Sequence, residues 1–200
     1  MAARWKRRSR RGAALPPKPI FLIELVVSSG SEIEQRLAEQ GLSPGEIILK
    51  CCWPRYAPPV DSGIRVIGKL ENLGQQFERL IAIHRAVPSS VPMPVGVVKS
   101  LEGEFVGYVL EYTRGDTLET LISLGLLEEA ERRLGIVEET VEKLHRKSIA
   151  HGDVNPSNVI AADDGRTLLI DPVPVPGPGM KLQDELCIAA IRTRIETLRA

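Results

Sequence analysis

The sequence predicts an α+β fold with strands concentrated in its first half and helices in its second half. Short apolar runs rich in β-branched residues recur up to residue 112, at 20–27, 46–53, 95–99 and 105–112. Beyond residue 113 the apolar residues recur at steps of three and four, most regularly over 127–148. With 200 residues and 43% apolar content, the chain suits one domain, or two lobes that share a cleft.

Charge and cysteine content narrow the classes of function. The 26 basic and 26 acidic residues balance, so no overall field favours an anionic partner. Three cysteines without a Cys-x-x-Cys spacing argue against disulfides and structural zinc, and they indicate a cytoplasmic protein. No apolar run reaches the roughly 20 residues of a membrane span. The run at 21–27 is interrupted by Glu24 and is interpreted as a strand rather than a signal peptide.

Residues 1–18 are expected to form a disordered basic tail. Positions 4–11 carry six Arg and Lys residues and no acid, and Pro16-Pro17 ends the segment. The alternative is that residues 4–11 contact a polyanion such as a nucleic acid, because clustered arginines bind phosphates.

The first half of the chain offers a lysine and a glutamate for phosphate chemistry. Lys50 lies on the strand expected at 46–53, and Glu78 lies on a helix that begins near Leu70 and ends before Val87-Pro88. Residues 63–69 match the GxxxxGK pattern, but Leu70 follows where a phosphate-binding loop needs Ser or Thr. We therefore expect a strand or a tight connection there.

The residues before the strand at 46–53 and after the helix that carries Glu78 also predict secondary structure. Ser28–Ser31 breaks the strand at 20–27 and precedes a helical stretch at 32–40, whose N-terminus could attract phosphate. The pattern at 95–112 predicts a hairpin that turns at 101–104. A short helix is expected to open at Thr117 and to end at Gly125.

The most informative stretch is 150–160, followed by 168–171. Asp153, Asn158 and Asp171 form an Asp-x4-Asn-x12-Asp pattern, and Asp163-Asp164-Gly165 predicts a hairpin turn between two short strands. This hairpin would present Asn158 and Asp171 side by side. Two carboxylates and an amide are the groups that Mg²⁺-dependent phosphoryl transfer uses.

This stretch resembles the catalytic and metal-binding loops of the protein-kinase-like superfamily, with His-Gly-Asp at 151–153 in place of His-Arg-Asp. The resemblance is to compact branches: RIO-type kinases, the small kinase of the KEOPS complex and aminoglycoside-type phosphotransferases. It implies a two-lobed fold, with a β-rich N-lobe over 19–112 and a truncated helical C-lobe over 113–200. It also implies a kinase that uses ATP and Mg²⁺.

The resemblance also implies a role for each candidate residue. Asp153 would orient the acceptor hydroxyl, Asn158 and Asp171 would hold Mg²⁺, and a Lys50–Glu78 ion pair would align the phosphates. The segment 109–115, with Glu111, would be the hinge that meets adenine. A last helix would open at Asp184, whose carboxylate would bind back to the loop that carries Asp153.

Some features depart from the family pattern and leave alternatives open. A Gly-rich loop between the first two strands is missing, and Pro172 follows Asp171 where Phe-Gly is usual. A pseudokinase that binds nucleotide or a partner is one alternative, and a nucleic-acid-associated protein with a basic arm is another. The phosphate acceptor stays open between a protein and a small molecule. Because 172–183 contains no Ser, Thr or Tyr, we expect no switching by phosphorylation there.

Overall fold

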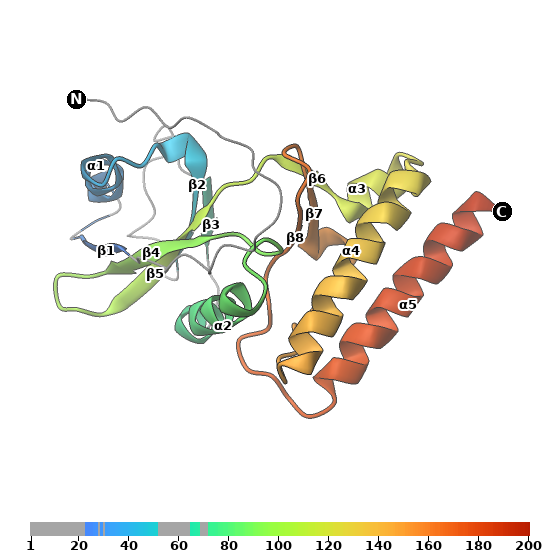
Figure 1. Ribbon diagram of the computed structural model, residues 1–200. Coiled ribbons are helices and arrows are strands. Elements are labelled where there is room, and N and C mark those ends of the chain that lie inside the picture. Colours follow the sequence, from blue (N-terminus) through green and yellow to red (C-terminus); the bar gives the residue numbers. More distant parts are fainter. Residues whose placement is uncertain (1–22, 28, 30, 52–64, 69–71) are drawn as a thin grey trace, which may run out of the picture.

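The computed structural model of the protein describes residues 23–27, 29, 31–51, 65–68 and 72–200. Within these ranges the chain forms a five-stranded sheet, a three-stranded sheet and five α-helices (Figure 1). The expected α+β class is therefore confirmed. The basic tail at 1–18 lies outside the described residues.

The larger sheet is mixed. Its strands are β1 (Ile23–Val26), β2 (Ile47–Cys51), β3 (Arg65–Gly68), β4 (Pro94–Lys99) and β5 (Phe105–Glu111), in the order β1-β4-β5-β2-β3. The expected hairpin is confirmed, since β4 and β5 are antiparallel, and β2 runs antiparallel to β5. The outer pairs β1–β4 and β2–β3 are parallel. The central residues of the GxxxxGK match, 65–68, form strand β3, so they do not form a phosphate-binding loop.

The first two strands of the chain are not neighbours in this sheet. Strands β4 and β5 lie between them, and α1 (Ser31–Glu39) and a 3-10 helix, η1 (Pro44–Glu46), connect them along the chain. Three inter-strand spacings of about 4.8 Å separate β1 from β2 by roughly 14 Å. The start of α1 therefore lies away from the strand that carries Lys50. Of the suggested phosphate-binding segment, Ser28 and Gly30 lie outside the described residues.

Helices α1 and α2 (Leu73–Ala86) cover opposite faces of the larger sheet. Leu49 and Val109 pack with Ile33 and Leu37 of α1, whereas the alternate residues pack with α2. Those alternate residues include Ile48, Tyr108 and Leu110, which contact the apolar stripe of α2 at Leu73, Phe77 and Leu80. Side chains two residues apart on a strand share a face, so Lys50 lies on the α2 face with Ile48.

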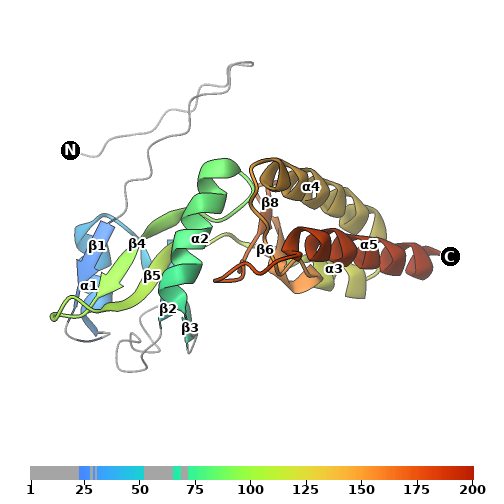
Figure 2. The same cartoon turned by 90° about the horizontal axis from the view of Figure 1, so that it is seen from below.

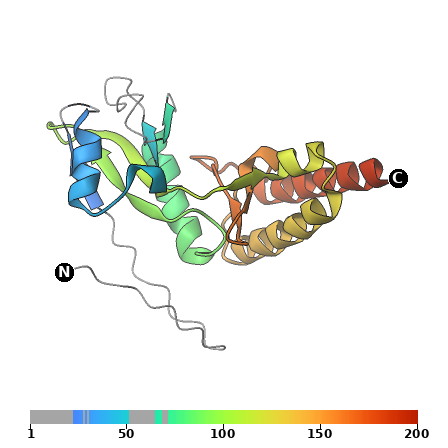
Figure 3. The same cartoon turned by 90° about the horizontal axis from the view of Figure 1, so that it is seen from above.

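The second half of the chain builds a helical layer on a small antiparallel sheet. The sheet consists of β6 (Gly115–Thr117), β7 (Val159–Ala162) and β8 (Thr167–Leu169), and the helices are α3 (Leu118–Ser123), α4 (Leu127–Arg146) and α5 (Met180–Arg199). Figures 2 and 3 show α4 and α5 running alongside one another. The last helix begins at Met180, four residues before the expected start at Asp184, and the residue before it, Gly179, has the αL conformation.

A single connection, residues 112–114, joins β5 of the larger sheet to β6 of the smaller one (Figure 3). A second link is formed through space, where the N–H of Leu169 on β8 donates to the carbonyl of Ser90 beyond α2 at 2.8 Å. None of the helices in the described ranges combines the length and apolar composition that a membrane span requires.

Candidate functional site

The two halves of the chain meet at an ion pair between Lys50 and Asp171, which are 121 residues apart in sequence. Lys50 is only 2% exposed, so its ammonium group requires a partner, and the Asp171 carboxylate provides it. The Asp171 side chain is itself 35% exposed, which leaves part of the carboxylate open to solvent. The cation predicted on β2 and the acid predicted after β8 are thus in contact.

Asp171 has an unusual backbone conformation. Its φ of 56° lies in the left-handed region, which Asp tolerates better than most residues. The next residue, Pro172, is buried, and its carbonyl accepts a hydrogen bond from Nε2 of Gln76 at 3.3 Å. Because residues held in rare conformations concentrate at functional sites, this geometry makes Asp171 a candidate.

The hairpin places Asn158 beside the segment that ends at Asp171, as predicted. Asn158 is the last residue of η4 (Pro156–Asn158), and β7 follows it at once. Its carbonyl accepts the N–H of Ile170 at 2.8 Å. The turn at 163–165 closes the hairpin with the N–H of Gly165 donating to the carbonyl of Ala162 at 3.0 Å.

Two amide side chains hold the carboxylate of Asp153. Asn158 Nδ2 donates to Oδ2 at 2.7 Å and to the Asp153 carbonyl at 3.0 Å, and Asn155 Nδ2 donates to Oδ1 at 3.0 Å. Asn155 is itself fixed, because its Oδ1 accepts the N–H groups of Ser157 and Asn158 at 3.0 and 3.1 Å. The Asp153 side chain is exposed, and the amide groups that orient it are neutral. Within the described part of the chain, no cation is bonded to it.

The oxygen groups of this cluster fit Mg²⁺. Because Asn158 uses its Nδ2 for Asp153, its Oδ1 remains free to act as a ligand, and Asp171 adds a carboxylate. Within the described residues, no three His, Cys, Asp or Glu side chains group as an all-protein metal site. This combination suits a cation held by one or two protein oxygens together with phosphate oxygens.

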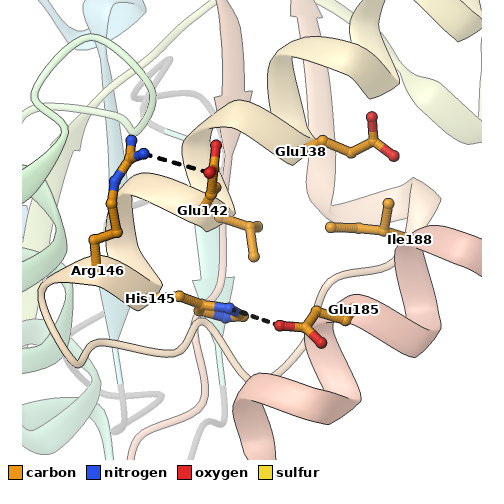
Figure 4. A pocket seen from close by; sticks show the side chains of 7 residues that line it. Glu138, Glu142, His145, Arg146, Glu185 and Ile188 are labelled. Carbon is orange, nitrogen blue, oxygen red and sulfur yellow. Dashed lines mark hydrogen bonds and ion pairs between the residues drawn. The ribbon is translucent and has the colours of Figure 1, made fainter.

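Asp184 of α5 anchors the loop that carries Asp153. Its buried carboxylate accepts the N–H groups of His151 at 2.8 Å and Gly152 at 2.7 Å, so the expected bond from this residue to the loop is present. His145, at the end of α4, adds a third contact from Nε2 at 3.1 Å. Its other ring nitrogen lies 3.3 Å from Glu185, beside a pocket between α4 and α5 (Figure 4).

Gly152 and His151 explain why this loop has its composition. Gly152 has φ of 87°, and a Cβ atom there would lie under 3.0 Å from side-chain atoms of Val173 and Met180. Position 152, where a His-Arg-Asp motif would carry arginine, therefore has no room for a side chain. His151 is fully buried, and burial lowers its pKa to about 4 although Asp184, Asp153 and Asp171 oppose the shift. The imidazole is consequently neutral at pH 7, and both of its ring nitrogens are buried without a hydrogen-bond partner among the described residues.

The predicted Lys50–Glu78 ion pair is not present. Glu78 is exposed on α2, and the residue that α2 turns toward the site is Gln76. Gln76 Oε1 accepts the hydroxyl hydrogen of Tyr108 at 2.8 Å, and Tyr108 lies opposite Lys50 in the sheet. The helical spacing could have indicated this, because position 76 lies on the buried stripe and position 78 lies far from it.

The side chain of Glu111 forms an ion pair that the sequence analysis did not anticipate. Its carboxylate receives Nη2 of Arg166 at 2.9 Å and Nη1 at 3.3 Å. Arg166 belongs to the β7–β8 hairpin, so this ion pair bridges the two sheets beside the 112–114 connection. The sequence offered no signal for it, since the two residues are 55 positions apart. A contact of the Glu111 backbone with adenine stays a prediction.

The cluster thus consists of Lys50, Asp171, Asn158 and Asp153, with Gln76, Asn155 and Asp184 as supporting residues.

Comparisons of the chain with protein-family models and with curated proteins found no match.

Proposed function

We propose that the protein is an ATP- and Mg²⁺-dependent phosphotransferase with the two-lobed arrangement of the protein-kinase-like superfamily. The first lobe would comprise residues 19–112 and the second residues 113–200. The observation that carries this proposal is the contact between Lys50 of β2 and Asp171 after β8, next to the Asp153–Asn158 pair. A buried lysine and two acids from distant parts of the chain meet in one place, in the residue types that phosphoryl transfer uses.

Each residue of the cluster has a role in this proposal. Mg-ATP would supply the phosphoryl group, with Asn158 and Asp171 as the protein ligands of the cation. Lys50 would bind the phosphates, which its buried position on β2 favours because charge interactions strengthen away from water. Asp153 would orient the acceptor hydroxyl and accept its proton, and the amides of Asn155 and Asn158 keep its carboxylate aimed.

A second candidate function is a pseudokinase, which would bind nucleotide without transferring phosphate. The exposed position of Glu78 and the neutral Gln76 in its place favour it, because no acid of α2 pairs with Lys50. The intact Asp153, Asn158 and Asp171 favour transfer instead. The third candidate, nucleic-acid binding through residues 4–11, rests on residues outside the described ranges and predicts binding that weakens steeply with salt.

A Mg-ATP titration followed by thermal unfolding tests the nucleotide site. The wild type should gain several degrees in Tm with ATP and Mg²⁺ together, and Asp171→Asn should lose most of the Mg²⁺-dependent part. Asp163→Asn is the matched control, since it removes one exposed carboxylate outside the cluster. Equal gains for the wild type and Asp171→Asn would contradict the metal assignment.

Turnover separates the kinase from the pseudokinase. With radiolabelled ATP, transfer to protein, to water or to a small hydroxyl compound should be detectable in the wild type and lost in Asp153→Asn. The affinity for ATP should stay within a few-fold, because Asp153 serves the acceptor rather than the nucleotide. ATP binding without transfer in the wild type would select the pseudokinase, and an active Asp153→Asn would exclude the proposed role of Asp153.

A further inference from the structure

A separate cavity of about 420 Å³ lies beside residues 148–150, which lead into the loop that carries Asp153. Its walls are Arg79 of α2, Ser148 and Ala150 before the loop, residues 176–180 and Lys181 of α5. Figure 1 shows the segment from β8 to α5 passing the C-terminal end of α4 before α5 begins. The cavity thus lies where α2, α4 and α5 meet, and none of Lys50, Asp153, Asn158 or Asp171 lines it.

Two cations face this cavity, and its walls carry no acid. Arg79 donates through Nη2 to the carbonyl of Ala150, and Lys181 donates through Nζ to the carbonyl of His145 at 2.8 Å. Neither forms an ion pair with a carboxylate within the described residues, and Nε of Arg79 is buried without a partner there. Asp184 is the carboxylate that raises the pKa of Arg79 against the lowering effect of burial, and it is already bonded to two backbone N–H groups.

The start of α5 adds to the positive potential. Gly179 precedes the helix with no side-chain cap, and the first turn contains no acid. Free N–H groups at the start of a helix act as a partial positive charge of about half a unit. A cavity with two cations that form no ion pair among the described residues, together with this helix end, favours an anion with several oxygens.

We propose that this cavity binds a phosphate group that does not belong to residues 172–183, the segment between Asp171 and Asp184. Lys181 has two ammonium hydrogens left for phosphate oxygens, and Arg79 provides a guanidinium. Residues 172–183 contain no hydroxyl to phosphorylate, so the phosphate is either a free anion or belongs to a group outside this stretch. Arg79 also donates to the carbonyl of Ala150, the residue before His151. A phosphate bound to Arg79 would therefore lie one contact away from the loop that carries Asp153. The proposal does not depend on the proposed phosphotransferase activity.

Amide NMR of the full-length protein, titrated with inorganic phosphate at constant ionic strength, tests this inference. The N–H signals of Gly177, Gly179 and Met180 should shift together, with a dissociation constant on the order of 1 mM. Lys181→Gln should weaken this binding by about tenfold. Lys147→Gln should leave it unchanged. Lys147 is the matched control, because it also donates to a backbone carbonyl, that of Ala86, but lies outside the cavity.

The outcomes separate this site from the others. Unchanged signals at Gly177, Gly179 and Met180 in the wild type would overturn the proposal, even if Lys181→Gln failed to fold. Equal binding by Lys181→Gln and Lys147→Gln would also overturn it. A Lys50→Met variant should retain the shifts, which makes failure at the nucleotide site distinguishable from failure here. A second titration with O-phosphoserine separates the sources: tighter binding than inorganic phosphate indicates a phosphorylated side chain, and equal binding indicates a free anion.

Discussion

Replacing Asp184 by Asn is the sharpest test of how the loop around Asp153 is held. The Asp184 side chain is fully buried, and its two oxygens accept N–H groups from His151 and Gly152 at 2.8 and 2.7 Å and a contact from His145 at 3.1 Å. Asparagine has nearly the same shape but only one acceptor oxygen. Its amide nitrogen would face one of the backbone N–H groups, donor against donor.

The cost follows from these contacts. A hydrogen bond to a charged group contributes about 1.5–3 kcal/mol, and the substitution removes at least one such bond and weakens the remaining ones. It also leaves a buried N–H without an acceptor, at about 1–3 kcal/mol. We expect a loss of about 3 kcal/mol in the free energy of unfolding. With a urea m-value of about 2 kcal/mol/M, the midpoint of unfolding should fall by roughly 1.5 M.

Urea unfolding followed by far-UV circular dichroism measures this shift. Asp163→Asn is the control, because it removes a carboxylate of the same charge from an exposed turn position and should change stability by less than about 0.5 kcal/mol. If Asp184→Asn unfolds at the same urea concentration as Asp163→Asn, the three contacts do not anchor the loop.

Three further predictions address the residues around the loop. Gly152→Ala should destabilise the fold by about 2 kcal/mol or more in urea unfolding, since Cβ would collide with side chains and φ is 87°; a neutral effect would contradict the geometry. The pKa of His151 falls from 6.5 in the unfolded chain to about 4 in the folded protein. Between pH 6.5 and pH 4 the unfolded chain therefore binds a proton at His151 that the folded protein does not bind. The free energy of unfolding should drop on the order of 3 kcal/mol as the pH falls through this range. His151→Leu should flatten that part of the pH profile, and an unchanged slope would refute the assignment. Glu78→Gln should leave the nucleotide-dependent gain in Tm unchanged. Gln76→Leu should reduce that gain, because it removes the contacts to Tyr108 and Pro172. A larger loss in Glu78→Gln than in Gln76→Leu would show that Glu78 belongs to the site.

Much of the local structure could be predicted from the sequence. Periodicity alone placed α4 and the β4–β5 hairpin, and the turn at 163–165 placed the β7–β8 hairpin, because these elements form between residues close in sequence. The same local geometry places Asn158 beside the segment that ends at Asp171 and allows its side chain to bind the carboxylate of Asp153. The residue types and the spacing of the Asp153-x4-Asn158-x12-Asp171 pattern were enough to make these side chains candidates.

The tertiary structure decided which partners meet across long sequence distances. The order β1-β4-β5-β2-β3 was not predictable, because the apolar pattern of a strand fixes its faces and leaves its neighbours open. The pairing of Gln76 with Tyr108 formed only when α2 packed on the sheet, and the bridge from Arg166 to Glu111 formed only when the two sheets came together. The contact of Lys50 with Asp171 has the same origin. It joins residues 121 positions apart, and burial of the lysine makes an opposite charge necessary without specifying which acid provides it.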